Sequence, residues 1–241
     1  ISSLKNFLFS FPLFTGTETD FSTAKINRKK FVSGQKNFGL GFNFCNFNAS
    51  YRQTLMEETR DIPAEELSAL RNPATRRGAF DRLVGAYLRP LYWHARRLVV
   101  VHEDAEDVVQ ETFIRAYDKI GTFRGGAGEL GAWLYRIATN TALTMLRRRR
   151  PGLFSSLDDV SRILASRVAE ECGEDADRTL VRFQQAILEL PLKQRLVFNL
   201  RYYDRMPYGE IARVLGQREE TLKVNYHHAV QKLKEKLTRE L

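Results

Sequence analysis

The feature that most constrains the fold is a helical hydrophobic stripe near the middle of the chain. Between residues 105 and 120 the apolar side chains recur at intervals of three and four (Ala105, Val108, Val109, Thr112, Phe113, Ala116, Tyr117 and Ile120). This spacing matches the 3.6-residue period of an amphipathic α-helix. Further helices are predicted at 63–70, 79–101, 130–150, 178–189, 192–203, 208–215 and 219–237. Because no segment from residue 56 onward alternates as a half-buried strand does, the sequence predicts an all-α protein.

Helix-breaking residues divide this pattern into two small helical domains. Pro151-Gly152 ends the helix predicted at 130–150, and a stretch rich in Gly, Ser and acidic residues follows it. We expect two helical domains joined by a flexible linker, the second containing a helix-turn-helix. The expected ranges are a lead-in helix at 56–76, a first domain at 77–150, an acidic linker at 151–177 and a second domain at 178–241.

Residues 1–55 differ in composition from the rest of the chain. They hold ten of the sixteen phenylalanines and show no sustained periodicity. Lys5 precedes the apolar run 7–14, which allows a signal peptide, but no clean small-residue cleavage site follows it. We therefore expect a disordered or non-native extension, with Met56 as the natural start of the protein.

The charge distribution points to a polyanionic partner. The net charge is +9, and +5 of it lies in residues 1–55. The remainder is basic, acidic and then basic: sixteen basic against thirteen acidic residues at 57–150, four against eight at 151–190, and eleven against six at 191–241. Net charge alone is weak evidence for nucleic-acid binding. The two cysteines are too few for a disulfide framework or a four-thiolate zinc site, which favours a reducing compartment.

The last two predicted helices have the pattern of a helix-turn-helix. Ala212 is small enough for close helix packing, Gly216 suits a left-handed turn, and Leu222 and Tyr226 would pack the second helix on the first. An ordinary pair of packed helices is the alternative, but the basic charge of the segment favours DNA. The outward residues of the turn and second helix include Arg218, Glu219, Glu220, Lys223, Val224, Asn225, His227 and His228.

Two further features suit nucleic acid. Four consecutive arginines, Arg147–Arg150, end the helix predicted at 130–150, where they could contact phosphates or simply be solvated. Aromatic and basic residues also alternate around a glycine-rich loop at 123–129, a composition that suits unstacked bases. This cluster comprises Phe123, Arg124, Trp133, Tyr135 and Arg136. For Trp133 taken alone, a place in the core is the preferred interpretation.

No pattern in the sequence predicts catalysis. The loop at 125–128 lacks the Lys-Ser/Thr that completes a phosphate-binding loop. His94 and His102 are interpreted as isolated, and the adjacent His227 and His228 point about 100° apart on a helix, so that they cannot chelate a metal together. We expect no enzyme activity, no cofactor and no metal site.

Three segments in order resemble the bacterial sigma-70 family of transcription initiation factors. The run DAEDVVQETFIRAY (104–117) resembles the helix that binds core RNA polymerase. FRG (123–125), AWLYRIA (132–138) and the arginine run resemble the part that opens and reads the downstream promoter element. LPLKQRLVF (190–198) and YGEIARVLG (208–216) resemble the domain that reads the upstream element. The short linker resembles the extracytoplasmic-function (ECF) subfamily, so that 77–150 would be sigma region 2 and 178–241 sigma region 4.

The resemblance implies roles for particular residues. The polymerase-binding residues would be Asp104, Asp107, Gln110 and Glu111, which would meet the clamp helices of the largest subunit. The downstream element would be contacted by Phe123, Arg124, Trp133, Arg136, Asn140, Arg147, Arg148, Arg149 and Arg150. The upstream element would be approached by Arg218, Lys223, Val224, Asn225, His227 and His228. Val224-Asn225 and His228 depart from the residues common in the family, so no upstream sequence preference carries over.

The resemblance also implies partners and a location. The partners would be core RNA polymerase (its clamp helices and flap), promoter DNA and an anti-sigma factor, in the cytoplasm and without membrane insertion. The alternative is a helix-turn-helix regulator that acts without binding core polymerase. The acidic face at Asp107–Glu111 separates the two hypotheses, because such a regulator does not need it.

Overall fold

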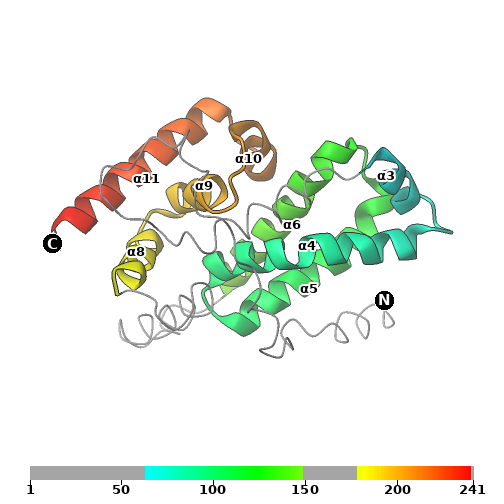
Figure 1. The fold of residues 1–241 in the computed structure, drawn as a ribbon, viewed down its shortest axis with the longest axis horizontal. Coiled ribbons are helices and arrows are strands. Elements are labelled where there is room, and N and C mark those ends of the chain that lie inside the picture. The colour runs from blue at the N-terminus through cyan, green and yellow to red at the C-terminus, as the bar shows by residue number, and fades with distance from the viewer. Residues whose placement is uncertain (1–62, 149–177, 240–241) are drawn as a thin grey trace, which may run out of the picture. The chain divides into compact units, whose positions relative to one another are not determined.

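The computed structural model describes residues 63–148 and 178–239, and every element of regular secondary structure in these ranges is helical (Figure 1). This confirms the all-α prediction. The expected extension at 1–55, residues 56–62 of the lead-in segment, the linker at 151–177, and Arg149 and Arg150 lie outside the described residues. The described helices all belong to one compact unit, Cys45–Leu241.

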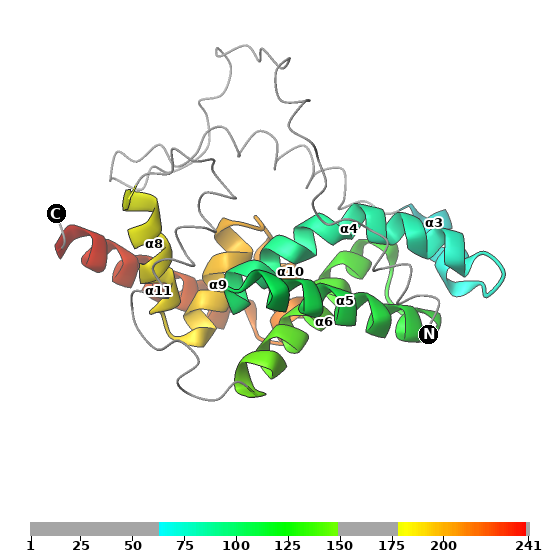
Figure 2. The same cartoon turned by 90° about the horizontal axis from the view of Figure 1, so that it is seen from below.

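The N-terminal helical group comprises α3 (Ala64–Arg71), α4 (Arg76–Val99), α5 (His102–Lys119), the short 3-10 helix η1 (Ile120–Thr122) and α6 (Ala127–Arg148). Helices α4, α5 and α6 pack against one another, as Figures 1 and 2 show, and α3 lies against α4 and η1. The core is built from side chains on the predicted stripes. Phe80 and Phe113 meet edge to face at 6.2 Å, and Leu91 on α4 and Leu134 on α6 are also fully buried.

Helix α4 continues through Pro90, although a proline inside a helix commonly kinks or ends it. An internal proline removes one backbone hydrogen bond and costs about 3 kcal/mol in a helix. Tyr87 and Leu91, on either side of the proline, are both buried against the neighbouring helices. Burial of this apolar surface offsets the local loss, so tertiary packing overrides the proline signal.

The C-terminal helical group comprises α8 (Arg178–Leu188), α9 (Leu192–Tyr202), α10 (Tyr208–Leu215) and α11 (Glu219–Arg239). Gly216 lies between α10 and α11 with φ of 65°, the left-handed conformation expected for it. Leu222, Ala229 and Leu233 form the buried stripe of α11. Tyr226 packs beside this stripe, with its ring stacked 5.9 Å from that of Phe198 on α9. These contacts confirm the helix-turn-helix.

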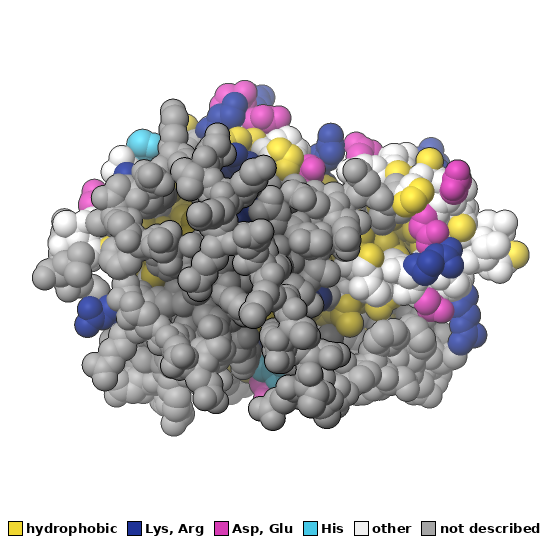
Figure 3. Space-filling view, viewed as in Figure 1, with side chains coloured by type: hydrophobic (Ala, Val, Ile, Leu, Met, Phe, Trp, Pro, Cys, Tyr) yellow, Lys and Arg dark blue, Asp and Glu magenta, His cyan; other side chains and the backbone are white. Residues whose placement is uncertain are grey.

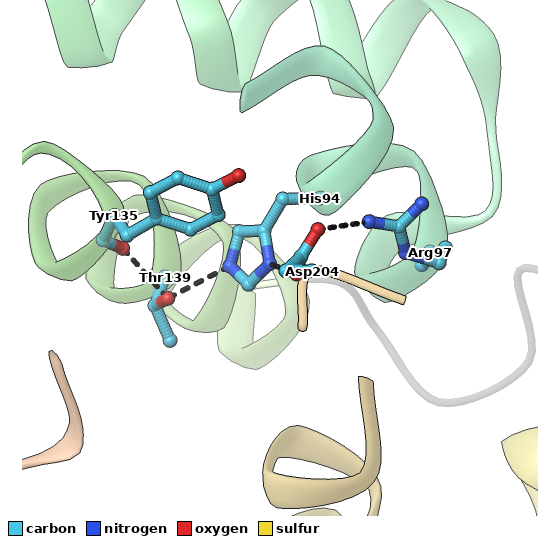
Figure 4. Close-up of polar contacts among 5 residues, drawn as sticks. All are labelled: His94, Arg97, Tyr135, Thr139 and Asp204. Carbon is cyan, nitrogen blue, oxygen red and sulfur yellow. Dashed lines mark hydrogen bonds and ion pairs between the residues drawn. The ribbon is translucent and has the colours of Figure 1, made fainter. Parts of the chain in front are cut away.

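A buried polar cluster joins α4 and α6 to the turn between α9 and α10 (Figure 4). Asp204 accepts a hydrogen bond from Arg97 at 2.5 Å and pairs with Nδ1 of His94 at 3.2 Å. Nε2 of His94 lies 2.9 Å from the hydroxyl of Thr139, which itself donates to the carbonyl of Tyr135. His94, Arg97 and Asp204 are almost completely buried. The structure therefore ties the N-terminal helical group to the C-terminal one through an ionic contact.

The contacts of His94 and His102 correct the interpretation of these two histidines as isolated. His94 contacts Asp204, a residue 110 positions later, and no sequence period could reveal such a contact. His102 lies 2.6 Å from the hydroxyl of Tyr92 and 3.3 Å from a carboxylate oxygen of Glu106. Both histidines are therefore parts of hydrogen-bonded groups.

Candidate nucleic-acid interface

The acidic residues of α5 occupy the outer face of the helix. Val108, Val109 and Phe113 are buried on its inner face, and Asp107 is exposed on the opposite side. Asp104, Gln110 and Glu111 are partly buried, and the Glu111 carboxylate pairs with Arg115 at 2.6 Å. The four residues expected to bind polymerase thus lie on one helix, with Asp107 the most available to a partner.

The loop between η1 and α6 presents an aromatic pair. The rings of Phe123 and Trp133 lie 5.0 Å apart at an interplanar angle of 43°, and both side chains are partly exposed. Trp133 is therefore not fully buried in the core, as the preferred interpretation of this residue alone would have it, and its ring packs on Phe123 of the loop. The loop ends in a capping contact, because Glu129 accepts a hydrogen bond from the backbone amide of Gly126 at 3.1 Å.

The outer face of α6 continues from this aromatic pair. Trp133, Arg136 and Asn140 follow at helical spacing, and Arg136 and Asn140 are exposed. Arg147 and Arg148 are exposed at the C-terminal end of the same helix. The face therefore offers an aromatic surface, an amide and several cations in a row, a combination that suits single-stranded nucleic acid.

Tyr135 does not belong to this cluster, although the sequence placed it there. It is 3% exposed, and its ring lies 5.0 Å from that of His94 on the opposite side of α6. Two positions along a helix rotate a side chain by about 200°, so Trp133 and Tyr135 face opposite sides. The alternation of aromatic and basic residues in the sequence therefore groups side chains that lie on two different faces of the helix.

The helix-turn-helix exposes the residues expected to approach the upstream element. Arg218, Lys223, His227 and His228 are exposed, Asn225 is partly exposed, and Val224 is 53% exposed. Such a second helix fits the major groove of DNA. The ammonium of Lys223 lies 5.9 Å from the ring centre of Tyr208, which keeps its side chain near the start of the helix. Burial raises the pKa of Tyr226 behind this surface.

Positive and negative side chains are interspersed over the described surface in the view of Figure 3. Within residues 63–148 and 178–239 no group of His, Cys, Asp and Glu side chains could hold a metal ion. None of the helices in those ranges combines the length and the apolarity that crossing a membrane requires.

Sequence reasoning missed two residues that contact the loop. Arg71, at the end of α3, donates to loop carbonyls, and Arg213 of α10 lies 3.7 Å from the carboxylate of Glu129. Arg71 is one of many basic residues outside the recognised motifs, and Arg213 lies 84 positions after Glu129 in the sequence. Nothing in their sequence neighbourhood signals these contacts.

The chain matches two family models. The model described as "Sigma-70 region 2" matches residues 83–151, and the one described as "Sigma-70, region 4" matches residues 180–233. Together these matches cover most of the described helices. They include α5, the loop, α6 and the helix-turn-helix.

Curated relatives and a solved structure agree with this assignment. The chain is 32% identical over 167 residues to the ECF RNA polymerase sigma factor SigW of Bacillus subtilis (strain 168), covering 66% of this chain and 89% of that protein. It is 33% identical over 147 residues to SigM of Mycobacterium tuberculosis (strain H37Rv), covering 61% and 71%. The solved structure of CnrH in complex with the cytosolic domain of CnrY has the same fold, with a TM-score of 0.52 and 22% identity over 79% of this chain and 99% of that one.

These findings decide between the two functions considered for the sequence. A helix-turn-helix regulator unrelated to polymerase would not match region 2, which contains the acidic helix and the loop. Members of the matched family are not enzymes. The chain therefore belongs to the ECF sigma-70 family and is a sigma factor that directs RNA polymerase to promoters for the initiation of transcription.

Proposed function

We propose that three surfaces divide the work of this sigma factor. The outer face of α5, with Asp104, Asp107, Gln110 and Glu111, binds the clamp helices of core polymerase. The loop at 123–129 and the outer face of α6 contact the downstream promoter element. The exposed face of α11 enters the major groove of the upstream element. In this scheme region 2 spans 77–150, region 4 spans 178–241, and 151–177 is the linker.

The observation that carries the proposal is the partly exposed pair of Phe123 and Trp133, followed along α6 by the exposed Arg136 and Asn140. An unstacked base can lie on an aromatic face, which is worth about 1–3 kcal/mol per base. Extruding a base from duplex DNA costs a few kcal/mol, a similar amount. Capture of one or two bases on this pair, with phosphates held by the arginines of α6, therefore offsets strand separation. No chemical step is needed.

Charge reversal on α5 tests the polymerase surface. Asp107→Lys combined with Glu111→Lys should abolish binding to core polymerase, because a basic face would then meet a basic partner. Both residues lie at the surface, so the fold should survive. Glu65→Lys combined with Glu235→Lys, both exposed and on other helices, makes the same change in charge and should leave binding intact. Equal binding by the two double variants would refute the assignment of α5.

Removal of the aromatic pair tests the DNA surface. Phe123→Ala combined with Trp133→Ala should leave binding to core polymerase unchanged and slow promoter opening, measured by permanganate oxidation of unpaired thymines. The promoter is obtained by in vitro transcription of genomic DNA with core polymerase, followed by start-site mapping. Normal opening by this variant would remove the base-capture role of the loop.

The exposed face of α11 is tested by its salt dependence. Lys223→Ala and Arg218→Ala should each weaken binding of the holoenzyme to the upstream element and reduce the slope of log K against log salt by about 1 if the residue contacts a phosphate. A residue that reads a base edge would instead relax sequence preference at one position.

The location and the regulatory partner complete the proposal. A protein that acts on core polymerase and promoter DNA works in the bacterial cytoplasm. The solved structure of CnrH holds it in complex with the cytosolic domain of CnrY. By analogy, we propose that a protein of the anti-sigma class holds this chain inactive, and co-purification of the chain from its host would test this.

A further inference from the structure

Arg71 connects α3 to the backbone of the loop. It is the last residue of α3, and its guanidinium donates from Nε to the carbonyl of Phe123 at 3.2 Å and from Nη2 to the carbonyl of Gly125 at 2.8 Å. Two loop carbonyls two residues apart are thus held by one planar, five-donor group. This contact spans more than 50 residues of sequence.

The loop is closely folded at the point that Arg71 holds. A Cβ atom on Gly125 would come within 2.5 Å of the Phe123 ring and within 2.8 Å of the Glu129 carboxylate. The backbone of Gly125 therefore lies directly against the ring of Phe123, and the other side of the loop is capped by Glu129. Because the Phe123 ring also packs on Trp133, the position of the Gly125 backbone fixes the geometry of the aromatic pair.

A second arginine, Arg76, binds the backbone at the end of α3, where Arg71 lies. Arg76, the first residue of α4, donates to the carbonyl of Leu70 at 3.0 Å and to that of Arg71 at 3.1 Å, which satisfies the C-terminal end of α3. The same guanidinium lies against Gly121 of η1, just before the loop, where a Cβ atom added to Gly121 would meet it at 2.9 Å. Arg71 therefore joins α3 to the loop, and Arg76 joins the end of α3 to η1, which directly precedes the loop.

From this geometry we propose that Arg71 is a positioning residue for base capture: it holds the loop so that Phe123 and Trp133 form a ready-made aromatic surface. Arg71 lies outside the residues matched to sigma region 2, so the downstream-reading unit of this chain extends into α3. The inference rests on the proposed role of the loop. A surface that is already ordered loses less entropy when a base arrives than one that must fold around it.

Two substitutions separate positioning from simple attraction to DNA. Arg71→Ala removes both the charge and the hydrogen bonds. Arg71→Lys keeps the charge but cannot reach two carbonyls with a planar fork. If Arg71 positions the loop, both variants should slow promoter opening by roughly five- to tenfold, as expected for the loss of two exposed hydrogen bonds. Arg77→Ala, which removes the same charge from an exposed site six residues away, should behave as wild type.

The free protein gives an independent readout of the loop. The chain has two tryptophans, Trp93 and Trp133, so a Trp93→Phe background reports on Trp133 alone. In this background, Arg71→Ala and Arg71→Lys should increase acrylamide quenching of Trp133 toward the level of Phe123→Ala, because the ring that covers it is released. Arg77→Ala should leave quenching unchanged.

The outcomes distinguish this inference from the proposed function. Normal opening with Arg71→Lys but slow opening with Arg71→Ala would overturn positioning and indicate a phosphate contact. Unchanged quenching in both Arg71 variants would also overturn it. A third outcome is that quenching rises while neither the Arg71 variants nor Phe123→Ala/Trp133→Ala affect promoter opening. In that case Arg71 does hold the loop in place, but the base-capture role of the loop is refuted.

Discussion

Asp204→Asn should destabilise the protein by about 3 kcal/mol. The Asp204 carboxylate and the Arg97 guanidinium lie 2.5 Å apart and are only 3% and 4% exposed, so neither can be solvated by water in place of its partner. Breaking such a buried pair costs about 3–5 kcal/mol, because one charge is left without compensation. Asparagine keeps one oxygen acceptor for Arg97, which places the expected loss at the lower end of the range.

Urea unfolding followed by circular dichroism measures this loss. For a protein of this size, 3 kcal/mol corresponds to a fall in Tm of about 6–12 °C. Arg97→Met should also destabilise the protein, and the double variant should lose less than the sum of the two single changes, because it no longer contains an uncompensated charge. The coupling between the two positions should therefore be about 2 kcal/mol.

An exposed ion pair provides the matched control. Arg82 and Glu66 form two hydrogen bonds at 2.8 and 2.9 Å, but the Arg82 side chain is 64% exposed. Water and salt can replace this contact, so Glu66→Gln should be indistinguishable from wild type. If Asp204→Asn is no more destabilising than Glu66→Gln, the argument that burial makes the Asp204 contact valuable is refuted.

Three further changes test the helix-turn-helix. Gly216→Ala should lower the free energy of unfolding in urea by about 1 kcal/mol. The loss comes from backbone strain alone, since φ is 65° and a Cβ atom there would meet no neighbour within 4 Å. An unchanged unfolding midpoint would contradict the left-handed turn. Leu222→Ala should cost about 2–5 kcal/mol by leaving a cavity under α11, and should weaken binding of the holoenzyme to promoter DNA in parallel. Burial raises the pKa of Tyr226 above its usual value of 10.0, so the unfolded chain loses this proton first and stability falls as the pH rises past about 10. Tyr226→Phe should lack that part of the alkaline loss in a pH series of unfolding curves, and identical pH profiles would contradict the assignment.

The helices could be predicted from the sequence because each depends on a local period. The stripe at 105–120 and the run Leu222, Ala229 and Leu233 place their apolar residues on one face, and the structure buries those faces. Gly216 was equally readable, since the left-handed conformation favours glycine. A boundary at Pro90, which the local sequence would favour, is absent from α4, because proline signals a local cost while the packing that offsets it comes from other helices.

The contacts that connect distant segments could not be predicted in the same way. His94 meets Asp204 across 110 residues, and Arg71 meets Gly125 across 54, so neither pair belongs to a common period. Tyr135 and Trp133 are close in sequence but lie on opposite faces of α6, and only the rotation of the helix separates them. Sequence therefore indicated which residue types surround the site, whereas the packing of α3 and α10 determined that Arg71 and Arg213 contact the loop.

The chemistry of the contact around Asp204 has a consequence for how the two helical groups can move apart. If the contact opens, the groups at its centre, Asp204, Arg97 and His94, pass into water, which solvates them well. If leucines formed the contact instead, its opening would expose an apolar patch, and such patches favour aggregation. A buried contact between opposite charges therefore holds the two helical groups together while it is closed and exposes polar rather than apolar groups when it opens, which would suit the two separate DNA-binding surfaces proposed above.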